Sequence, residues 1–209
     1  MNYFLQQTKD HFKLDHTLPF AAASIAASPT HALVYTKDGR IWGRGSNRYG
    51  QLGTDPSQIQ SLDTFQPIEF FDGLDFGQAL RQVACGPFHS AVIVGGDLYT
   101  FGWRQDGRLG WDESEMEEDV IIGLPTFVDG NDQAIDVTVV QVACGSAHTI
   151  AVDDQGRAWS CGSNKYGQLG RPAPPEGDGV FRQCTAYTGK AIRCSAGRWN
   201  SFIESVPHS

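Results

Sequence analysis

One segment occurs three times in the chain, and this internal repeat limits the possible folds more than any other feature of the sequence. The copies read IAASPTHALVYTKDGRIWGRGSNRYGQLG at 25–53, VACGPFHSAVIVGGDLYTFGWRQDGRLG at 83–110 and VACGSAHTIAVDDQGRAWSCGSNKYGQLG at 142–170. A truncated fourth copy, SAGRWNSFIE, lies at 195–204. Repeats of this length are typical of solenoids and propellers, whose units bury their apolar faces only by stacking on one another.

Two kinds of residue mark equivalent positions in the copies. The first is a histidine, replaced by asparagine in the last copy, at His31, His89, His148 and Asn200, which are spaced 58, 59 and 52 residues apart. The second is a pair of glycines: Gly50 and Gly53, Gly107 and Gly110, Gly167 and Gly170. The 24 glycines in 209 residues exceed the average share of roughly 7%, and much of this excess marks the turns of the repeat.

Each copy is predicted to form a β-hairpin. Apolar runs such as 32–35 and 150–152 precede a short turn that contains glycine, and a second run of strand-forming residues follows it. Glycine permits the positive φ that tight hairpin turns need. The turns are Asp38-Gly39, Gly95-Gly96 and Gln155-Gly156.

Two more strands are predicted upstream of each hairpin, and together they define the fold class. The third strand is expected at 83–85 and 142–144, and a weaker fourth strand at 66–71, 126–129 and 183–187. Four short antiparallel strands in each copy predict an all-β fold, a β-propeller of four-stranded blades. The repeats span about 19–53, 66–110, 126–170 and 183–205, which gives about three and a half to four blades.

The repeat has the form Gly-x-x-His-Ser/Thr, a hairpin, and then Trp/Phe-Gly-x-Asn-x-x-Gly-Gln-Leu-Gly. In this form it resembles the regulator of chromosome condensation (RCC) repeat. The third copy carries the motif at Gly145, His148, Thr149, Gly162, Asn164, Gly167, Gln168, Leu169 and Gly170. The resemblance covers about 19–205, with departures at Ser28, Trp103-Arg104 and Asn200. It implies a propeller, and the family usually has seven blades.

Closure of the ring is the main structural question. Segment 1–18 contains NYFLQ at 2–6 and Leu14, which can supply a partner strand for the incomplete last blade. The termini then clasp one another, and residues 19–209 form a closed four-bladed ring, which is the arrangement that we favour. The alternative is an open arc, either the C-terminal half of a longer family member or a half-propeller that forms a homodimer, because exposed strand edges favour association.

Charge and cysteine spacing exclude several classes of function. With 16 Lys and Arg against 24 Asp and Glu, the formal net charge is −8 and no basic run is present, so a nucleic-acid partner is not expected. The five cysteines contain no Cys-x-x-Cys pair, which favours reduced thiols over a zinc site. No apolar run is long enough to span a membrane. We therefore predict an intracellular protein, cytoplasmic or nuclear, that has no membrane contact and needs no metal or cofactor.

The regular histidines and cysteines are better explained by structure than by chemistry. His31, His89 and His148 could suggest a metal site, but each occupies the same place in a different copy. We expect each imidazole to bond backbone groups near its own Gly-x-x-His turn, and we expect Cys85 and Cys144 to be small buried residues. No Walker A loop, Gly-x-Ser-x-Gly elbow or His-Glu-x-x-His motif is present, so we predict no enzyme, with exchange-factor activity left open.

Loop residues that differ between the copies are the candidates for binding a protein, because the repeat geometry does not demand them. Trp103-Arg104 replaces Ser-Asn of the sister copies, and Trp and Arg are typical interface anchors, although blade packing is an equal alternative. The run 111–119 contains six acids and is expected to be a solvated loop, or else a docking loop for a basic partner. The candidate set is Arg44, Arg48, Trp103, Arg104, Gln105, Trp111, Asp112, Glu113 and Lys165.

Three functions are compatible with these patterns. The first is a non-enzymatic adaptor that binds a protein partner through its blade loops. The second, implied by the resemblance, is a guanine-nucleotide exchange factor for a small GTPase. The third is an alpha-tubulin-suppressor-like adaptor, whose partner would be a small zinc protein of diphthamide synthesis and transfer-RNA wobble modification. The third rests on the similarity of Gly189 to Ile192 and Ser195 to Gly197 to that group.

Overall fold

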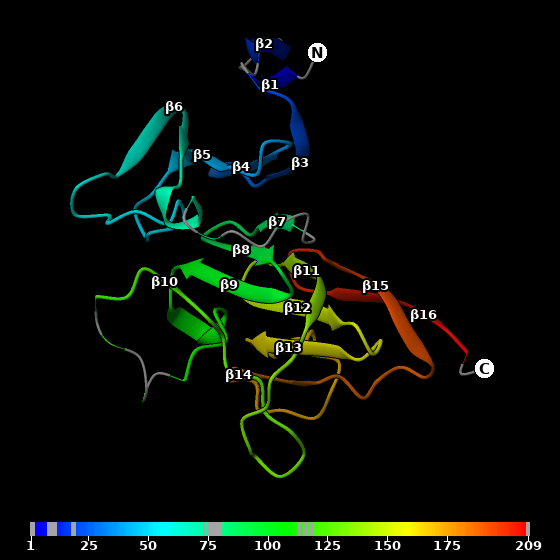
Figure 1. Cartoon of the computed structure of the whole chain (residues 1–209). Helices are drawn as coiled ribbons and strands as arrows, with labels where there is room; N and C mark the ends of the chain where they lie inside the picture. The colour runs from blue at the N-terminus through cyan, green and yellow to red at the C-terminus, as the bar shows by residue number, and fades with distance from the viewer. Residues whose placement is uncertain are drawn as a thin grey trace.

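The computed structural model describes residues 3–7, 12–17, 20–72, 74, 81–112, 114, 117 and 119–207, and its strands form five antiparallel sheets (Figure 1). The first blade contains β3 (Ala22–Ala27), β4 (His31–Thr36), β5 (Ile41–Ser46) and β6 (Ser61–Pro67). The second contains β7 (Arg81–Cys85), β8 (His89–Val94), β9 (Asp97–Gly102) and β10 (Ile122–Gly123). The third contains β11 (Val139–Cys144), β12 (His148–Asp153), β13 (Ala158–Gly162) and β14 (Asp178–Gln183). The prediction of an all-β fold of four-stranded blades is confirmed.

Two smaller sheets flank the three complete blades. A half-blade of two strands, β15 (Lys190–Ala196) and β16 (Ser201–Val206), follows the third blade. A hairpin of β1 (Tyr3–Gln7) and β2 (Phe12–Thr17) precedes the first. Two short 3₁₀ turns, η1 (Glu69–Phe71) and η2 (Gln105–Gly107), lie in the connections. No helix in the part of the chain that the structure describes has the length and hydrophobicity needed to cross a membrane.

The blades stack side by side through their first strands. β3 contacts β7, β7 contacts β11, and β11 contacts β15, so these equivalent strands form the inner row of an arc. Figure 1 shows the sheets following one another along this arc, with β1 and β2 beyond one end and β16 at the other. The second strands β8 and β12 are buried along their whole length, since each has a neighbouring blade on both faces. This explains why their sequences are continuous apolar runs rather than alternating ones.

Each junction between blades has its own apolar core. The first core joins Leu33 and Phe71 to Val92 and Phe101. The second contains Ala91, Ile93, Val142, Trp159 and Phe181. The third, against the half-blade, contains Ile150, Cys184 and Cys194. Because burial of one large apolar side chain is worth about 1.5–3 kcal/mol, these junctions, and not isolated sheets, stabilise the arc.

A hydrogen-bond relay that includes the repeated histidine crosses every one of these junctions. His31 Nε2 lies 2.7 Å from Ser90 Oγ in the next blade, and that hydroxyl donates to the carbonyl of Gln51 at 2.8 Å. The same relay recurs at the two later junctions. Its members are His89, Thr149 and the carbonyl of Arg108, and then His148, Ser201 and the carbonyl of Gln168.

The relay fixes the protonation state of the rings. A hydroxyl has a single proton, and here it is given to the carbonyl, so the hydroxyl must accept from Nε2–H of the histidine. Each ring therefore carries a proton on Nε2, and because burial lowers the pKa of all three rings, each is the neutral Nε2–H tautomer at neutral pH. We expected each imidazole to bond backbone groups of its own turn. This prediction is wrong for Nε2, whose partner is a hydroxyl of the next blade.

The glycine of the Gly-x-x-His turn makes room for the ring. A Cβ on Gly86 would lie 2.5 Å from the carbonyl oxygen of Gly145 and 2.6 Å from Cε1 of His89. The first blade has Ser28 instead, and there Oγ of Ser28 lies 3.0 Å from Nδ1 of His31. The departure at Ser28 therefore exchanges close ring packing for a hydrogen bond to the ring.

The Asn-x-x-Gly-Gln-Leu-Gly loops hold themselves together. Asn47 Oδ1 accepts from Leu52 N at 2.8 Å, and Asn47 Nδ2 donates to the carbonyls of Thr54 and Ile59. Asn164 repeats the bond with Leu169 in the third blade. The carbonyls of Gln51 and Gln168, which accept the hydroxyl proton of the relay, belong to these loops. The loop motif and the histidine therefore form one structural unit.

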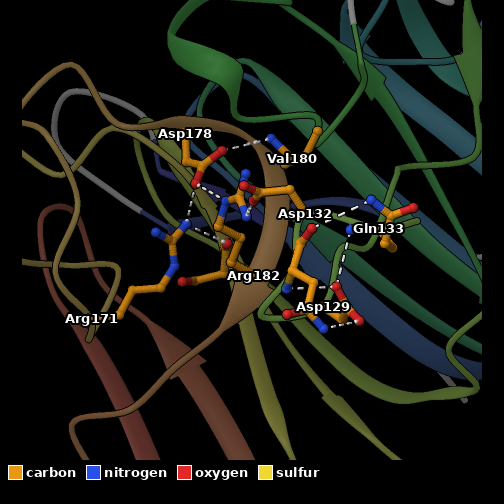
Figure 2. A network of polar contacts seen from close by, with 9 residues as sticks. Asp129, Asp132, Gln133, Arg171, Asp178, Val180 and Arg182 are labelled. Carbon is orange, nitrogen blue, oxygen red and sulfur yellow. Dashed lines mark hydrogen bonds and ion pairs between the residues drawn. The ribbon is translucent and has the colours of Figure 1, made fainter. Parts of the chain in front are cut away.

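An ion-pair network ties the connection before the third blade to the outer strand of that blade (Figure 2). Asp178 on β14 accepts from Arg182 at 2.7 Å and from Arg171 at 3.0 Å. Arg182 also pairs with Asp132, in the turn that Asp129 caps by accepting from Gln133 N at 3.0 Å. Figure 2 shows Arg182 lying between the two carboxylates, so one side chain bridges both segments.

Two sequence-based assignments are corrected by the strand order. The fourth strands are β6, β10 and β14, which close the blade of the preceding hairpin, whereas 66–71, 126–129 and 183–187 were expected to open the next blade. The N-terminal clasp is wrong as well, because Tyr3–Gln7 pairs with Phe12–Thr17 and β15–β16 is a separate two-stranded sheet. The blades therefore form an open arc rather than a ring closed by segment 1–18.

The relay predicts that the protein loses stability under mildly acidic conditions. Burial lowers the pKa of His31 and His148 from 6.5 to about 4, and burial beside the Arg108 cation lowers the pKa of His89 well below 6.5. The unfolded chain takes up these protons below pH 6.5 while the folded chain does not. As the pH falls from 6.5 to about 4, His31 and His148 therefore each remove about 1.4 kcal/mol of unfolding free energy per pH unit. His89 lowers the unfolding free energy in the same direction.

Urea unfolding at a series of pH values checks this slope. The matched variants are His31→Gln and His148→Gln, since the Gln amide can still donate to the hydroxyl of the next blade but does not titrate. We expect each variant to flatten the slope by about one histidine's share. An unchanged slope in the double variant contradicts the assignment of neutral buried rings.

Candidate functional site

The turns and loops of successive blades meet on one face of the arc and line a groove of about 640 Å³. Small side chains from the ends of the four inner strands form part of its lining: Ala27, Cys85, Cys144 and Ala196. Larger residues from the loops complete it, among them Phe88, Trp103, Arg108 and Trp199. Cys85 and Cys144 line this groove and are half-buried, whereas they were expected to be small buried residues. A concave, largely apolar groove with a few polar groups is the usual form of a binding site.

Two smaller hollows continue the groove on either side. One, of about 480 Å³, is lined by Tyr49, Trp103, Arg104 and Gln105, and it shares Trp103 with the groove. The other, of about 300 Å³, shares Trp199 with the groove and includes Tyr166. We call the aromatic residues that link the three hollows the aromatic face. They are Tyr49, Phe88, Trp103, Tyr166 and Trp199.

The aromatic face is built across blade junctions. Tyr49 of the first blade stacks on Trp103 of the second with ring centroids 4.8 Å apart, and Phe88 meets both rings edge-on. Tyr166 of the third blade packs on Trp199 of the half-blade at 5.5 Å. Tyr166 and Tyr49 are equivalent repeat positions and remain 61% and 40% exposed. The face is thus held in place by the blades and is open to a partner.

Arg108 connects the aromatic face to the second junction. Its guanidinium lies 4.7 Å from the centre of the Trp103 ring, donates to the carbonyls of Gln105 and Ser146, and pairs with Asp106. Burial lowers the pKa of Arg108, and the Asp106 carboxylate acts against this lowering. Arg108 stands where the sister copies have a Gln, at Gln51 and Gln168, whose side chains instead accept from the backbone of their own turn. The substitution places a cation in the groove wall.

The thiols of the groove are poorly suited to nucleophilic chemistry. Burial raises the pKa of Cys85 to about 12 and the pKa of Cys144 well above its usual value of 9.0. Both therefore stay protonated at neutral pH, and the thiolate is the reactive form. Among the described residues, no group of three or more His, Cys, Asp and Glu side chains is arranged to hold a metal ion.

The structure brings some of the predicted binding residues together and separates others. Trp103, Arg104 and Gln105 line one hollow, and Lys165 is exposed beside Tyr166 with its Nζ 5.7 Å from the ring centre. Arg44 and Arg48 line a separate hollow next to β6. Asp112 caps a turn by accepting from Ser114 N at 3.0 Å, and Glu113 lies outside the described residues.

Trp111 was wrongly assigned to a binding surface. Its side chain is 2% exposed, and its Nε1 donates to Thr100 Oγ1 at 2.8 Å. Arg104 lies 4.8 Å above the Trp111 ring and donates to the carbonyl of Val120. Arg104 therefore fastens the end of the acidic run to the second blade, so blade packing explains much of its role.

Several residues of the groove and its neighbouring hollows were not among the predicted binding residues: Tyr49, Phe88, Arg108, Tyr166, Arg198 and Trp199. Phe88 and Trp199 occupy one repeat position, where the other copies have Thr30 and Ala147, and Arg198 lies 5.8 Å from the centre of the Trp199 ring. The four copies differ at this position, in the turn before the histidine. A comparison of that turn between the copies would have identified the two aromatic residues.

Comparisons with known proteins agree with the repeat assignment. Residues 22–51, 38–93, 95–152 and 139–168 match the family described as "Regulator of chromosome condensation (RCC1) repeat". The "X-linked retinitis pigmentosa GTPase regulator homolog" of Caenorhabditis elegans is 36% identical over 152 residues, which are 70% of this chain and 10% of that protein. The "Secretion-regulating guanine nucleotide exchange factor" of Mus musculus is 36% identical over 154 residues, 73% of this chain and 30% of that protein.

A solved structure shares the fold. Prp20p from Saccharomyces cerevisiae superposes with a TM-score of 0.71 over 90% of this chain and 44% of its own length, at 21% sequence identity. This similarity concerns the fold alone. The chain spans less than half the length of each of these relatives.

The contrasting burial of Trp111 and Trp103 predicts contrasting effects on stability. Replacement of the buried ring in Trp111→Ala is expected to cost about 3–5 kcal/mol, since it also removes the donor to Thr100. Trp103→Ser, which introduces the residue of the sister copies, is expected to cost less than half as much. Denaturant unfolding of both variants measures the difference. Equal costs would show that Trp103 is a packing residue rather than a surface one.

Proposed function

The chain belongs to the regulator of chromosome condensation (RCC1) repeat family, and we propose that it is a non-enzymatic propeller adaptor whose aromatic face binds a protein partner. The observation that carries this proposal is the gathering of Tyr49, Phe88, Trp103, Tyr166 and Trp199 around one groove. Trp, Tyr and Arg dominate the energetics of protein interfaces, because they combine large contact areas with hydrogen bonding.

The charges around the groove indicate what kind of partner fits. Arg198 is exposed beside Trp199, and Lys165 is exposed beside Tyr166, although the whole chain has a net charge of −8. Arg198 lines the apolar groove, and Lys165 lies beside the hollow that Tyr166 lines. A partner loop that inserts an apolar side chain and carries a carboxylate next to it would satisfy both features.

Exchange of guanine nucleotides is the second candidate. One relative is named a guanine nucleotide exchange factor, and Prp20p is described as having binding properties to Gsp1p and histones. Both relatives are more than twice as long as the part that this chain covers. The intracellular location and the alpha-tubulin-suppressor-like role with a small zinc protein stay predictions.

Quantitative affinity purification tests the adaptor proposal. Trp103→Ser and Trp199→Ala remove two anchors and introduce residues that other copies have at the same positions, so the blades are expected to fold normally. Leu124→Ser is the matched control, because Leu124 is 56% exposed and is not part of the aromatic face. We expect at least one protein to be depleted at least tenfold by both face variants and retained by the control. If no protein shows this pattern, the proposal is wrong.

A nucleotide-release assay separates the two candidates. The chain is mixed with any small GTPase that it captures, loaded with fluorescent GDP. An adaptor leaves the release rate unchanged, whereas an exchange factor accelerates release in a manner that Trp103→Ser weakens. The second outcome would replace the adaptor proposal by exchange activity at the same face.

A further inference from the structure

At two blade junctions, a tyrosine of the loop after the hairpin packs against an aromatic side chain of the next blade. Tyr49 of the first blade meets Phe88 of the second with ring centroids 5.6 Å apart. Tyr166 of the third blade meets Trp199 of the half-blade at 5.5 Å. The two tyrosines occupy one repeat position, and their two partners occupy another. A pair of rings therefore closes the aromatic face at the first and third junctions.

The second junction lacks both rings. Asp106 stands at the tyrosine position of the second blade, and Ala147 stands at the partner position of the third blade. Both residues line the groove. We call the place between these two side chains the notch. The second and third blades each have four strands, so the notch lies between two complete blades.

Two further residues that distinguish the second loop, Trp103 and Arg108, leave the notch open. Trp103 leans toward the first blade, where it stacks on Tyr49 at 4.8 Å and meets Phe88 edge-on at 5.4 Å. Arg108 crosses the second junction to the carbonyl of Ser146 at 2.9 Å, and its side chain is buried, so it lies at the base of the notch. The groove that contains the notch has a volume of about 640 Å³, which is typical of ligand pockets.

Asp106 presents a carboxylate to the notch. Its side chain is 48% exposed, and its Oδ2 pairs with Arg108. A carboxylate has lone pairs on both oxygens, so it can accept a further hydrogen bond from a ligand. An occupant that covered this group without donating a bond would be penalised, because an acceptor removed from water needs a partner. The occupant of the notch therefore needs a hydrogen-bond donor.

The other charges of the groove disfavour a cationic occupant. Arg108 lies at the base of the notch, and the exposed Arg198 lines the same groove. These two guanidinium groups and the Asp106 carboxylate together carry a positive charge, which repels an inserted lysine or arginine. A neutral ring avoids this repulsion and gains contact with the aromatic walls Phe88 and Trp103.

We propose that the notch binds a tyrosine side chain of a protein partner. The ring of this tyrosine takes the place that Tyr49 and Tyr166 fill at the other junctions, and its hydroxyl donates to Asp106. A carboxylate beside the tyrosine in the partner would meet Arg198. This inference rests on the proposed adaptor function, and it names the anchor that the aromatic face recognises.

The compound 4-methylphenol, which is the side-chain analogue of tyrosine, tests the notch directly. Added to the isotope-labelled chain, it is expected to shift the NMR signal of the Ala147 methyl group. We expect it to bind about fivefold more tightly than toluene, which lacks the hydroxyl, because one net hydrogen bond accounts for such a factor. The lysine analogue n-butylammonium should bind more weakly than 4-methylphenol. The proposal is wrong if the Ala147 signal does not move, or if toluene or n-butylammonium binds as tightly as 4-methylphenol.

Two variants test the two sides of the notch. Ala147→Phe introduces the ring that the sister position has at Phe88, and it is expected to weaken the binding of 4-methylphenol roughly tenfold or more without lowering the melting temperature. Asp106→Gly removes the acceptor, and glycine readily adopts the φ of 62° found at this position. In Asp106→Gly, 4-methylphenol and toluene should bind equally, whereas the control Leu124→Ser should bind as the unmodified chain does. Unchanged binding in Ala147→Phe, or a preserved preference in Asp106→Gly, contradicts the proposal.

Affinity purification with Ala147→Phe separates this inference from the adaptor proposal. Proteins that are depleted by Trp103→Ser and Trp199→Ala should also be depleted by Ala147→Phe. If Ala147→Phe retains them, the tyrosine anchor is wrong and the adaptor proposal stands. If the variants of the aromatic face deplete no protein, the adaptor proposal fails, and the tyrosine of a protein partner fails with it.

Discussion

The contact on which the arc depends is the bond from a neutral histidine to a hydroxyl of the next blade. That hydroxyl, in turn, closes the loop of the histidine's own blade by donating to the carbonyl of Gln51, Arg108 or Gln168. A buried ring without such a partner would be costly, because polar groups removed from water must be satisfied within the protein. The same relay therefore fixes the orientation of adjacent blades, the closure of each loop and the tautomer of each ring. The aromatic face lies on these turns and loops, so the relay also sets its position.

Periodicity predicted most of the fold, because hairpins with glycine turns and apolar second strands repeat where both faces are buried. The fourth strands were misplaced for a physical reason. β10 consists of Ile122 and Gly123 only, and β6 and β14 are largely polar edge strands, so neither length nor alternation marks them. A repeat in the sequence also does not define where one blade ends and the next begins. The repeat alone therefore could not show that these strands complete the preceding blade rather than begin the following one.

Departures of one copy from its sisters predicted residues that the structure places at the groove, although their role in binding stays a prediction, and the sequence misled where burial decided. Trp103 lies at the centre of the face, as its departure from serine suggested. Trp111 has an acidic neighbourhood in sequence, but its ring is needed to fill the second blade and to satisfy Thr100. Arg108 was overlooked because Arg and Gln are both polar, although only Arg can stack on Trp103 and bridge to Ser146.

Nitrogen-detected NMR of the histidine rings tests the relay most directly. The rings of His31, His89 and His148, assigned with single His→Gln variants, should give the signals of the neutral Nε2–H tautomer at neutral pH. They should keep those signals in the folded protein at about pH 5.5, where a free imidazole is mostly protonated. Imidazolium signals at that pH, or the Nδ1–H tautomer at any pH, would contradict the relay as the bond between blades.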